Sequence, residues 1–267
     1  MEKANVLIDY IRSKTTIVPE IGLILTSGFS SFEKEFDEKV VIPLTDIKGF
    51  PCLGKDKKNK IVIGRVNGRS VIALLGRMHS YLGYAPEVYA APVFAMKELG
   101  CKYFITGTGV GAINTRYKVG DLFIANDYIN NSGENPLNGL KDVYGSKYFD
   151  MSIPYSVEGR KKALKVAKDL RIKTRDGILI EFCGPNGETA AEIRMARYFG
   201  ADVVCSHITK ETILARYCGL KAMSINLITN FASGYSDSRV KYEDIHYNMD
   251  VSSDYFCDYL ADVIKIL

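Results

Sequence analysis

Short, almost entirely apolar runs alternate with helix-like segments along most of this chain, and that alternation limits its fold more than any other feature. The runs IGLIL at residues 21–25 and VIALL at residues 71–75 are examples. A strand that is apolar along its whole length must be covered on both faces, because a face open to water would carry alternate polar residues. Helices between successive strands provide that cover. We therefore predict an α/β fold, with a single domain over residues 1–267.

The boundaries of the predicted elements follow from apolar runs, hydrophobic periodicity and the positions of glycine and proline. Strands are expected at residues 20–28, 60–66, 69–76, 101–106, 121–127, 177–184, 201–206 and 221–229. Helices are expected at residues 4–13, 86–100, 157–170, 189–200, 209–219 and 250–267. The two strands beside the VNG turn at residues 66–68 form a hairpin, which makes the sheet mixed. Residues 128–155 follow no regular pattern, and so long a loop indicates a role at a site or a subunit contact.

Composition and charge exclude several classes of protein. The 35 basic and 31 acidic residues give a formal charge of only +4, without a basic stripe. The densest basic run, residues 55–60, is expected to be a solvated loop and not a nucleic-acid contact. No apolar run approaches the length of a bilayer span, and residues 1–20 lack a signal-type core. The six scattered cysteines favour neither a disulfide framework nor a zinc site. We therefore expect a cytoplasmic protein that binds neither nucleic acid nor membrane.

Polar residues gather where the predicted strands end. In α/β sheets, ligands bind at the carboxyl ends of strands. The polar stretches at such ends are TSGFSS (26–31), GRMHSY (76–81), GTGVGAIN (107–114), CGPNGETAAE (183–192), SHITKE (206–211) and TNFASG (229–234). The first could be an anion nest or an ordinary turn. GTGVGA fits a dinucleotide fingerprint, but no amphipathic helix follows it, which disfavours that interpretation.

Arg77 and His79 lie on the same side of the chain at the end of an apolar run. An arginine fork suits an oxyanion such as phosphate, and a histidine adds a second donor. The alternative is that Arg77 is an ordinary surface residue at a strand end. If the functional interpretation holds, we expect the guanidinium to contact the anion and not the nucleoside, so that Arg77→Ala would raise the phosphate requirement far more than the nucleoside requirement.

Glu188 stands at the start of a predicted helix, directly after an apolar strand. A carboxylate there is favoured by the helix dipole alone. It could instead accept hydrogen bonds from the N–H groups of a ligand. Asn230, at the end of another strand, offers both a donor and an acceptor. Glutamate and asparagine without metal-ligand spacing favour recognition of a heterocycle edge over metal or nucleophilic chemistry.

Taken together, these motifs resemble those of the trimeric purine nucleoside phosphorylases and their methylthioadenosine phosphorylase relatives. The match runs in chain order almost from end to end, through the Ser/Gly turn after the first strand, GRMHSYLGY, GTGVGAIN, ENPLNG, CGPNGETAAE, GADVV and ARYCGLKAMSINLITN, to the C-terminal helix after His246. The set is specific, although no single motif is. The resemblance implies one nucleoside phosphorylase domain, with a mixed, distorted barrel-like central sheet flanked by helices.

The resemblance also implies a role for each residue of the site. Phosphate would be held by Ser27, Arg77, His79, His207 and the backbone around Gly109. The ribose would contact Tyr81, Ser206, His246 and, from a neighbouring subunit, Tyr148. Glu188 and Asn230 would hold the purine edge beside Gly187, and with His79 they would be the catalytic residues. Inorganic phosphate would be the co-substrate, with no metal or other cofactor, and the enzyme would be a homotrimer.

Three positions depart from the family pattern. Gly187 replaces the usual Phe beside the base, Ser206 replaces a Met beneath the ribose, and His207 replaces a Ser or Thr at the phosphate. The implied reaction is reversible phosphorolysis of 6-oxopurine nucleosides or deoxynucleosides, such as inosine and guanosine, to free base and pentose 1-phosphate. This is a pentosyltransferase reaction of purine salvage. The alternatives are a methylthioadenosine- or adenosine-type phosphorylase, which Asn230 in place of Asp disfavours, and a non-catalytic nucleoside-binding relative.

Overall fold

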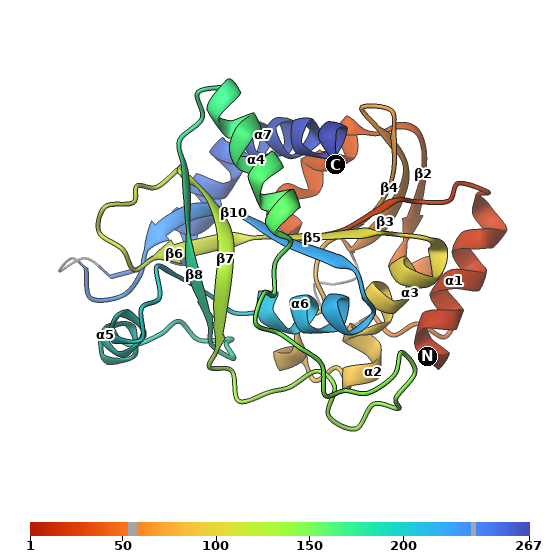
Figure 1. Ribbon diagram of the computed structural model, residues 1–267, viewed down its shortest axis with the longest axis horizontal. Helices are drawn as coiled ribbons and strands as arrows, with labels where there is room; N and C mark the ends of the chain where they lie inside the picture. Colours follow the sequence, from red (N-terminus) through yellow and green to blue (C-terminus); the bar gives the residue numbers. More distant parts are fainter. Residues whose placement is uncertain (53–57, 236–238) are drawn as a thin grey trace.

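A ten-stranded mixed sheet runs through the molecule, as a computed structural model shows (Figure 1). The structure describes residues 1–52, 58–235 and 239–267. In spatial order the strands are β2 (Asp37–Pro43), β3 (Lys60–Val66), β4 (Arg69–Leu75), β1 (Ile21–Leu25), β5 (Tyr103–Gly107), β10 (Lys221–Phe231), β6 (Gly109–Ala112), β9 (Val203–Cys205), β8 (Thr174–Glu181) and β7 (Leu122–Asn130). Strand β7 pairs back onto β10, so the last five strands close into a small barrel. The predicted mixed α/β fold with a barrel-like sheet is therefore confirmed.

Helices cover both faces of the open part of the sheet (Figure 1). One face carries α1 (Glu2–Lys14), α2 (Pro86–Tyr89), α3 (Ala91–Leu99) and α6 (Ile208–Tyr217), which share one apolar core. The other face carries α4 (Val157–Asp169) and the long α7 (Tyr242–Ile266), in a second core. Helix α5 (Ala190–Tyr198) packs separately beside the barrel. None of the helices in the described ranges combines the length and apolar character needed to cross a bilayer.

Parallel pairing brings several strand ends to one edge of the sheet. Strand β1 pairs in parallel with both β4 and β5, so that Leu25 lies opposite Leu75 and Gly107. Strand β10 is parallel to β5 and β6. The segments that follow these strands therefore leave the sheet on the same side, which is where α/β sheets bind their ligands. The 3₁₀ helices η1 (Ser27–Glu35) and η4 (Ser80–Leu82) both begin there.

Helix α7 fixes the turn that follows β1. The ring of Phe29 stacks on Phe256, with their centroids 3.9 Å apart and both side chains fully buried. The Ser253 hydroxyl also donates to the Gly28 carbonyl at 3.1 Å. Residue Ser27 precedes these contacts directly. Its backbone position therefore depends on the packing of the C-terminal helix.

Several predicted boundaries were wrong, each for a physical reason. Strand β2 was not predicted because it is an edge strand whose residues are mostly exposed, with three charged residues at its start and only a short apolar run at its end. The glycine-rich GVGA segment, taken for a turn, is strand β6 between β10 and β9. Helix α7 begins at Tyr242 and not near residue 250, because its first turns are exposed and polar. Strand β7 continues to Asn130, into the segment predicted to be irregular. The basic loop at residues 55–60 lies partly outside the described residues.

Candidate active site

A cavity of about 690 Å³ opens at the edge of the sheet where the parallel strands end. This volume is typical of a small-molecule site. Its walls come from β6, the segment between β8 and α5, the turn after β9, the end of β10 and the start of α7. Five of the predicted site residues line it, namely Gly109, Gly187, Glu188, Ser206 and Asn230. A Cβ built on Gly187 meets no atom within 4 Å, so this part of the wall is open.

Glu188 is not the residue that caps the following helix. The N-cap of α5 is Thr189, whose hydroxyl accepts from the Glu192 backbone N–H while the Glu192 carboxylate accepts from Thr189. This capping box satisfies the helix terminus without Glu188. Burial at the cavity wall raises the pKa of Glu188. Glu188 therefore stands one residue before the N-cap, is not needed to cap the helix, and is one of the residues that line the cavity.

The amide of Asn230 is held at the cavity wall by its neighbours. Its oxygen accepts from the Thr229 hydroxyl at 2.9 Å, and its nitrogen donates to the Phe231 carbonyl at 2.9 Å. An amide has a second N–H and a second lone pair beyond these contacts. The pairing of β10 with β6 shifts register between Ile228 and Asn230, at the point where the side chain must face the cavity. The group can therefore offer both a donor and an acceptor to a ligand.

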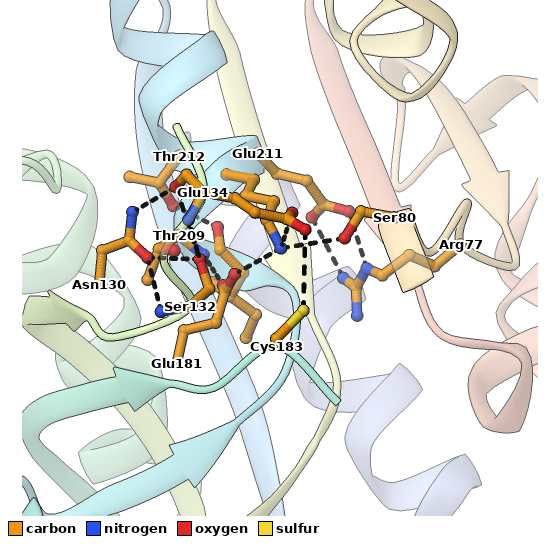
Figure 2. Close-up of polar contacts among 12 residues, drawn as sticks. Arg77, Ser80, Asn130, Ser132, Glu134, Glu181, Cys183, Thr209, Glu211 and Thr212 are labelled. Atoms are coloured by element: carbon orange, nitrogen blue, oxygen red, sulfur yellow. Dashed lines mark hydrogen bonds and ion pairs between the residues drawn. The ribbon is translucent and has the colours of Figure 1, made fainter. Parts of the chain in front are cut away.

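Arg77 is deeply buried, with 3% of its surface exposed, so it is not an ordinary surface residue. Its Nε donates to Glu211 Oε1 at 2.7 Å, and its Nη2 donates to Glu211 Oε2 at 3.2 Å (Figure 2). Nη2 also donates to the Thr106 hydroxyl at 2.8 Å, and that hydroxyl donates to Glu211. The guanidinium therefore has a partner within the protein, and its expected contact with an anion stays a prediction. One edge of the fork is bound by a carboxylate of the protein, and all of these contacts use Nε and Nη2.

His79, His207 and Tyr81 form an aromatic cluster beside Arg77. The His79 and His207 rings lie 3.9 Å apart edge to face, and His79 stacks on Tyr81 at 4.8 Å. Within the described residues, His79 Nδ1 and His207 Nε2 are buried and have no hydrogen-bond partner. Burial, together with the nearby charges of Arg77 and Lys210, lowers the pKa of His79 to about 3. Burial also holds the pKa of His207 well below its usual value. Both rings are therefore neutral near pH 7.

A charge cluster that includes Glu134, Glu181 and Lys210 was not identified by the sequence analysis (Figure 2). The Lys210 ammonium contacts Glu134 at 2.9 Å, Glu181 at 3.2 Å and the Ser80 hydroxyl at 3.1 Å. Burial opposes the charge on Lys210, but the two carboxylates outweigh it and raise its pKa. A signal was present in the sequence. Glu181 interrupts an otherwise apolar strand, and a charge at such a position must find a partner inside the protein.

Seven of the predicted site residues are not among the described residues that line the cavity: Arg77, His79, Tyr81 and His207, which form the neighbouring buried cluster, and Ser27, Tyr148 and His246. Ser27 is exposed at the start of η1. His246 is exposed on α7, and its ring centroid lies 4.3 Å from that of Tyr242. Tyr242 and Ile245 are among the described residues that line the cavity, but His246 is not. Tyr148 is 98% exposed. Within the described ranges, no group of three or more histidine, cysteine, aspartate or glutamate side chains is placed to hold a metal ion.

The neutral state of the two buried histidines can be tested by NMR. The ring proton signals of His79 and His207 should not show the ordinary histidine titration near about pH 6.5, because the pKa of His79 is lowered to about 3 and burial holds the pKa of His207 well below its usual value. His79→Gln and His207→Gln variants assign the signals. A histidine whose pKa is lower in the folded than in the unfolded chain contributes stability above about pH 6.5. This contribution is lost as the pH falls, so the free energy of unfolding should decrease below that pH. A midpoint near pH 6.5 for either ring would contradict this.

Comparison with known proteins agrees with this geometry. A family model described as the phosphorylase superfamily matches residues 20–265. The chain is 36% identical over 238 residues to purine nucleoside phosphorylase 1 of Geobacillus stearothermophilus, covering 88% of this chain and 87% of that protein. It is 31% identical over 228 residues to the Mus musculus purine nucleoside phosphorylase, covering 83% and 79%.

The fold matches solved structures as well. A crystal structure of Schistosoma mansoni purine nucleoside phosphorylase in complex with inosine superposes with a TM-score of 0.93 and 29% identity, covering all of this chain and 97% of the other. The fold, the order of the motifs and the sequence identity therefore agree along nearly the whole chain. The chain belongs to the phosphorylase superfamily and, within it, to the purine nucleoside phosphorylases.

Proposed function

We propose that this chain catalyses the reversible phosphorolysis of 6-oxopurine nucleosides and deoxynucleosides such as inosine and guanosine. The observation that carries the proposal is the placement of Glu188 and Asn230 in one cavity, at the same sheet edge as the buried Arg77. The carboxylate and amide suit a purine edge, and the guanidinium suits phosphate. Inorganic phosphate is the co-substrate, and no other cofactor takes part. Residues 1–267 act as one nucleoside phosphorylase domain.

The phosphate is bound on the Arg77 side of the cavity. Because Glu211 already binds Nε and Nη2, Nη1 is the nitrogen that donates to the anion. The unpartnered ring nitrogens of His79 and His207 are further polar groups on this side. The Ser27 hydroxyl and the backbone at Gly109 complete the set. A Cβ on Gly109 would lie 2.8 Å from Thr229 Cγ2, so the close packing of this strand requires glycine and leaves its backbone at the cavity wall.

The ribose lies between the phosphate and the base. Tyr81, stacked on His79, and Ser206, at the cavity wall, are its proposed contacts within the chain. His246 lies one residue beyond Ile245, which lines the cavity. It is the proposed contact of the 5′-hydroxyl, and it needs a rotation toward the cavity to reach it. Placing the anomeric carbon above the phosphate brings the reacting atoms together before the bond breaks.

The chemistry is a displacement at the anomeric carbon. A phosphate oxygen attacks this carbon as the glycosidic bond breaks, positive charge develops on the ribose, and the electron pair leaves with the purine. The phosphate dianion stabilises the ribose charge from below. Asn230 donates to N7 of the leaving purine, and Glu188 accepts from N1–H. Donors aimed at developing charge typically contribute roughly 10²–10³ in rate each.

We further propose a homotrimer in which each site receives Tyr148 from a neighbouring subunit. The almost complete exposure of this large aromatic ring supports the proposal, because a lone tyrosine in water gains nothing from its apolar surface. It lies in the long irregular segment between β7 and α4, where sequence reasoning placed a subunit contact. A cytoplasmic location is supported by the cysteines, none of which forms a disulfide among the residues that the structure describes.

The reaction is tested by supplying inosine to the purified chain with and without phosphate. Release of hypoxanthine should require phosphate and should be accompanied by an equal amount of ribose 1-phosphate, because phosphate is the attacking group. Xanthine oxidase coupling measures the base. Turnover that is equally fast in phosphate-free buffer would instead identify a hydrolase.

Base choice is tested by Asn230→Asp. The native pair of Glu188 and Asn230 should prefer inosine to adenosine by at least about ten-fold, because adenine presents a bare N1 to the carboxylate and leaves it unpaired. The substituted carboxyl can accept from the 6-amino group, so the ratio of kcat/KM for the two nucleosides should shift toward adenosine. A wild-type enzyme that prefers adenosine or methylthioadenosine would show that these two residues have been assigned wrongly.

Subunit sharing is tested by complementation. Tyr148→Ala and Glu188→Ala subunits should each be weakly active, and trimers mixed by co-expression should regain activity, because some sites combine an intact Glu188 with a neighbour's intact Tyr148. The matched control mixes Glu188→Ala with Asn230→Ala, which lie in the same site of one chain and should not complement. Sedimentation gives the subunit number. A fully active monomer, or no recovery at any mixing ratio, would exclude the arrangement.

A further inference from the structure

Lys210 is an ammonium group buried almost completely, with 3% of the residue exposed, beside the proposed phosphate site. Its three contacts are Ser80, Glu134 and Glu181, and the three come from separate parts of the chain (Figure 2). Glu181 ends β8 and is itself fully buried, whereas Glu134 is half-buried and lies in the irregular segment after β7. One side chain therefore joins α6, β8, the irregular segment and the turn after β4.

The Lys210 ammonium donates a hydrogen bond to Ser80 and forms ion pairs with Glu134 and Glu181, whose contacting oxygens accept no hydrogen bond from the described residues. An ammonium has three N–H groups, and three oxygen atoms lie within 3.2 Å of it. Glu181 is held in turn by the Thr209 backbone N–H at 2.6 Å, so its carboxylate has little freedom to turn away. With these three oxygens around its ammonium, Lys210 is assigned no direct contact with phosphate. Any effect it has on the substrate must act through the groups that it holds.

Those groups lie next to the proposed phosphate ligands. Ser80 stands between His79 and Tyr81 in the chain, so the bond from Lys210 fixes the backbone that carries both rings. Lys210 also lies about one helical turn after His207, the N-cap residue of α6. His79 and His207 pack edge to face, and their relative position depends on how α6 sits against the turn after β4. Lys210 is a side chain that connects these two elements at this point.

We propose that Lys210 is a positioning residue of the phosphate site, which sets His79 and His207 through Ser80, Glu134 and Glu181. The proposal rests on the proposed function for the roles of the two histidines. The competing explanation is that Lys210 only neutralises two neighbouring carboxylates. A neutralising role concerns stability alone, whereas a positioning role also sets the affinity for phosphate. The two explanations therefore predict different phosphate affinities for a variant in which both Lys210 and the charge of Glu181 are removed.

The test measures the binding of inorganic phosphate and of hypoxanthine by calorimetry, together with Tm. Lys210→Met should lower Tm, because it leaves the buried Glu181 and the half-buried Glu134 without their cation. It should raise the Kd for phosphate by about ten-fold or more, the equivalent of one lost charge-assisted hydrogen bond. The Kd for hypoxanthine should stay within about two-fold, because the base binds at Glu188 and Asn230.

The double variant Lys210→Met/Glu181→Gln separates the two explanations. It should recover most of the lost Tm, because the substituted amide is neutral and can still accept from the Thr209 backbone, but its Kd for phosphate should remain raised. Lys221→Met is the matched control, since it removes an ion pair with Glu158 at the opposite end of β10 and should change neither Kd. A double variant that binds phosphate as tightly as the wild type would overturn the proposal. The proposed function is tested separately, by measuring inosine turnover by the wild-type protein.

Discussion

The buried ion pair of Arg77 and Glu211 is the interaction on which the site depends most. It joins the end of β4 to α6 with two hydrogen bonds and includes Thr106 of β5. Breaking such a pair from one side typically costs about 3–5 kcal/mol, because the remaining charge is left buried without a partner. The pair therefore holds α6 against the sheet. Since His207 is the N-cap residue of α6 and Lys210 lies in its first turn, the groups proposed to surround the phosphate depend on this pair.

The residues proposed to bind the base and those proposed to bind phosphate are held in place in different ways. Glu188, Ser206 and Asn230 line an open cavity and come from segments at the rim of the small barrel. Arg77, His207 and Lys210 are almost fully buried, and each contacts a neighbouring carboxylate or ring. A rigid, desolvated anion site beside a more open base site fits a reaction in which phosphate must be aligned and the purine must leave.

Much of the fold could be predicted from the sequence, because apolar strands and capped helices give strong local signals. Glu188, Asn230, Ser206 and Gly109 were predicted site residues, and the structure brings them to one cavity. The partner of Arg77 could not be predicted, because Glu211 is 134 residues away in the sequence and its sequence context is that of an ordinary helical glutamate. Strand β2 and the first turns of α7 lack apolar periodicity because water covers them. His246 and Tyr148 remain predictions, because their proposed contacts depend on a rotation and on another subunit.

The most direct test of this account is a crystal structure of the protein grown with phosphate and hypoxanthine. The account predicts a phosphate within hydrogen-bond distance of Arg77 Nη1, His79 and Ser27, while Arg77 keeps both bonds to Glu211. It also predicts hypoxanthine with N1–H facing Glu188 and N7 facing Asn230. Phosphate bound away from Arg77, or a base that leaves Glu188 and Asn230 without contact, would contradict it.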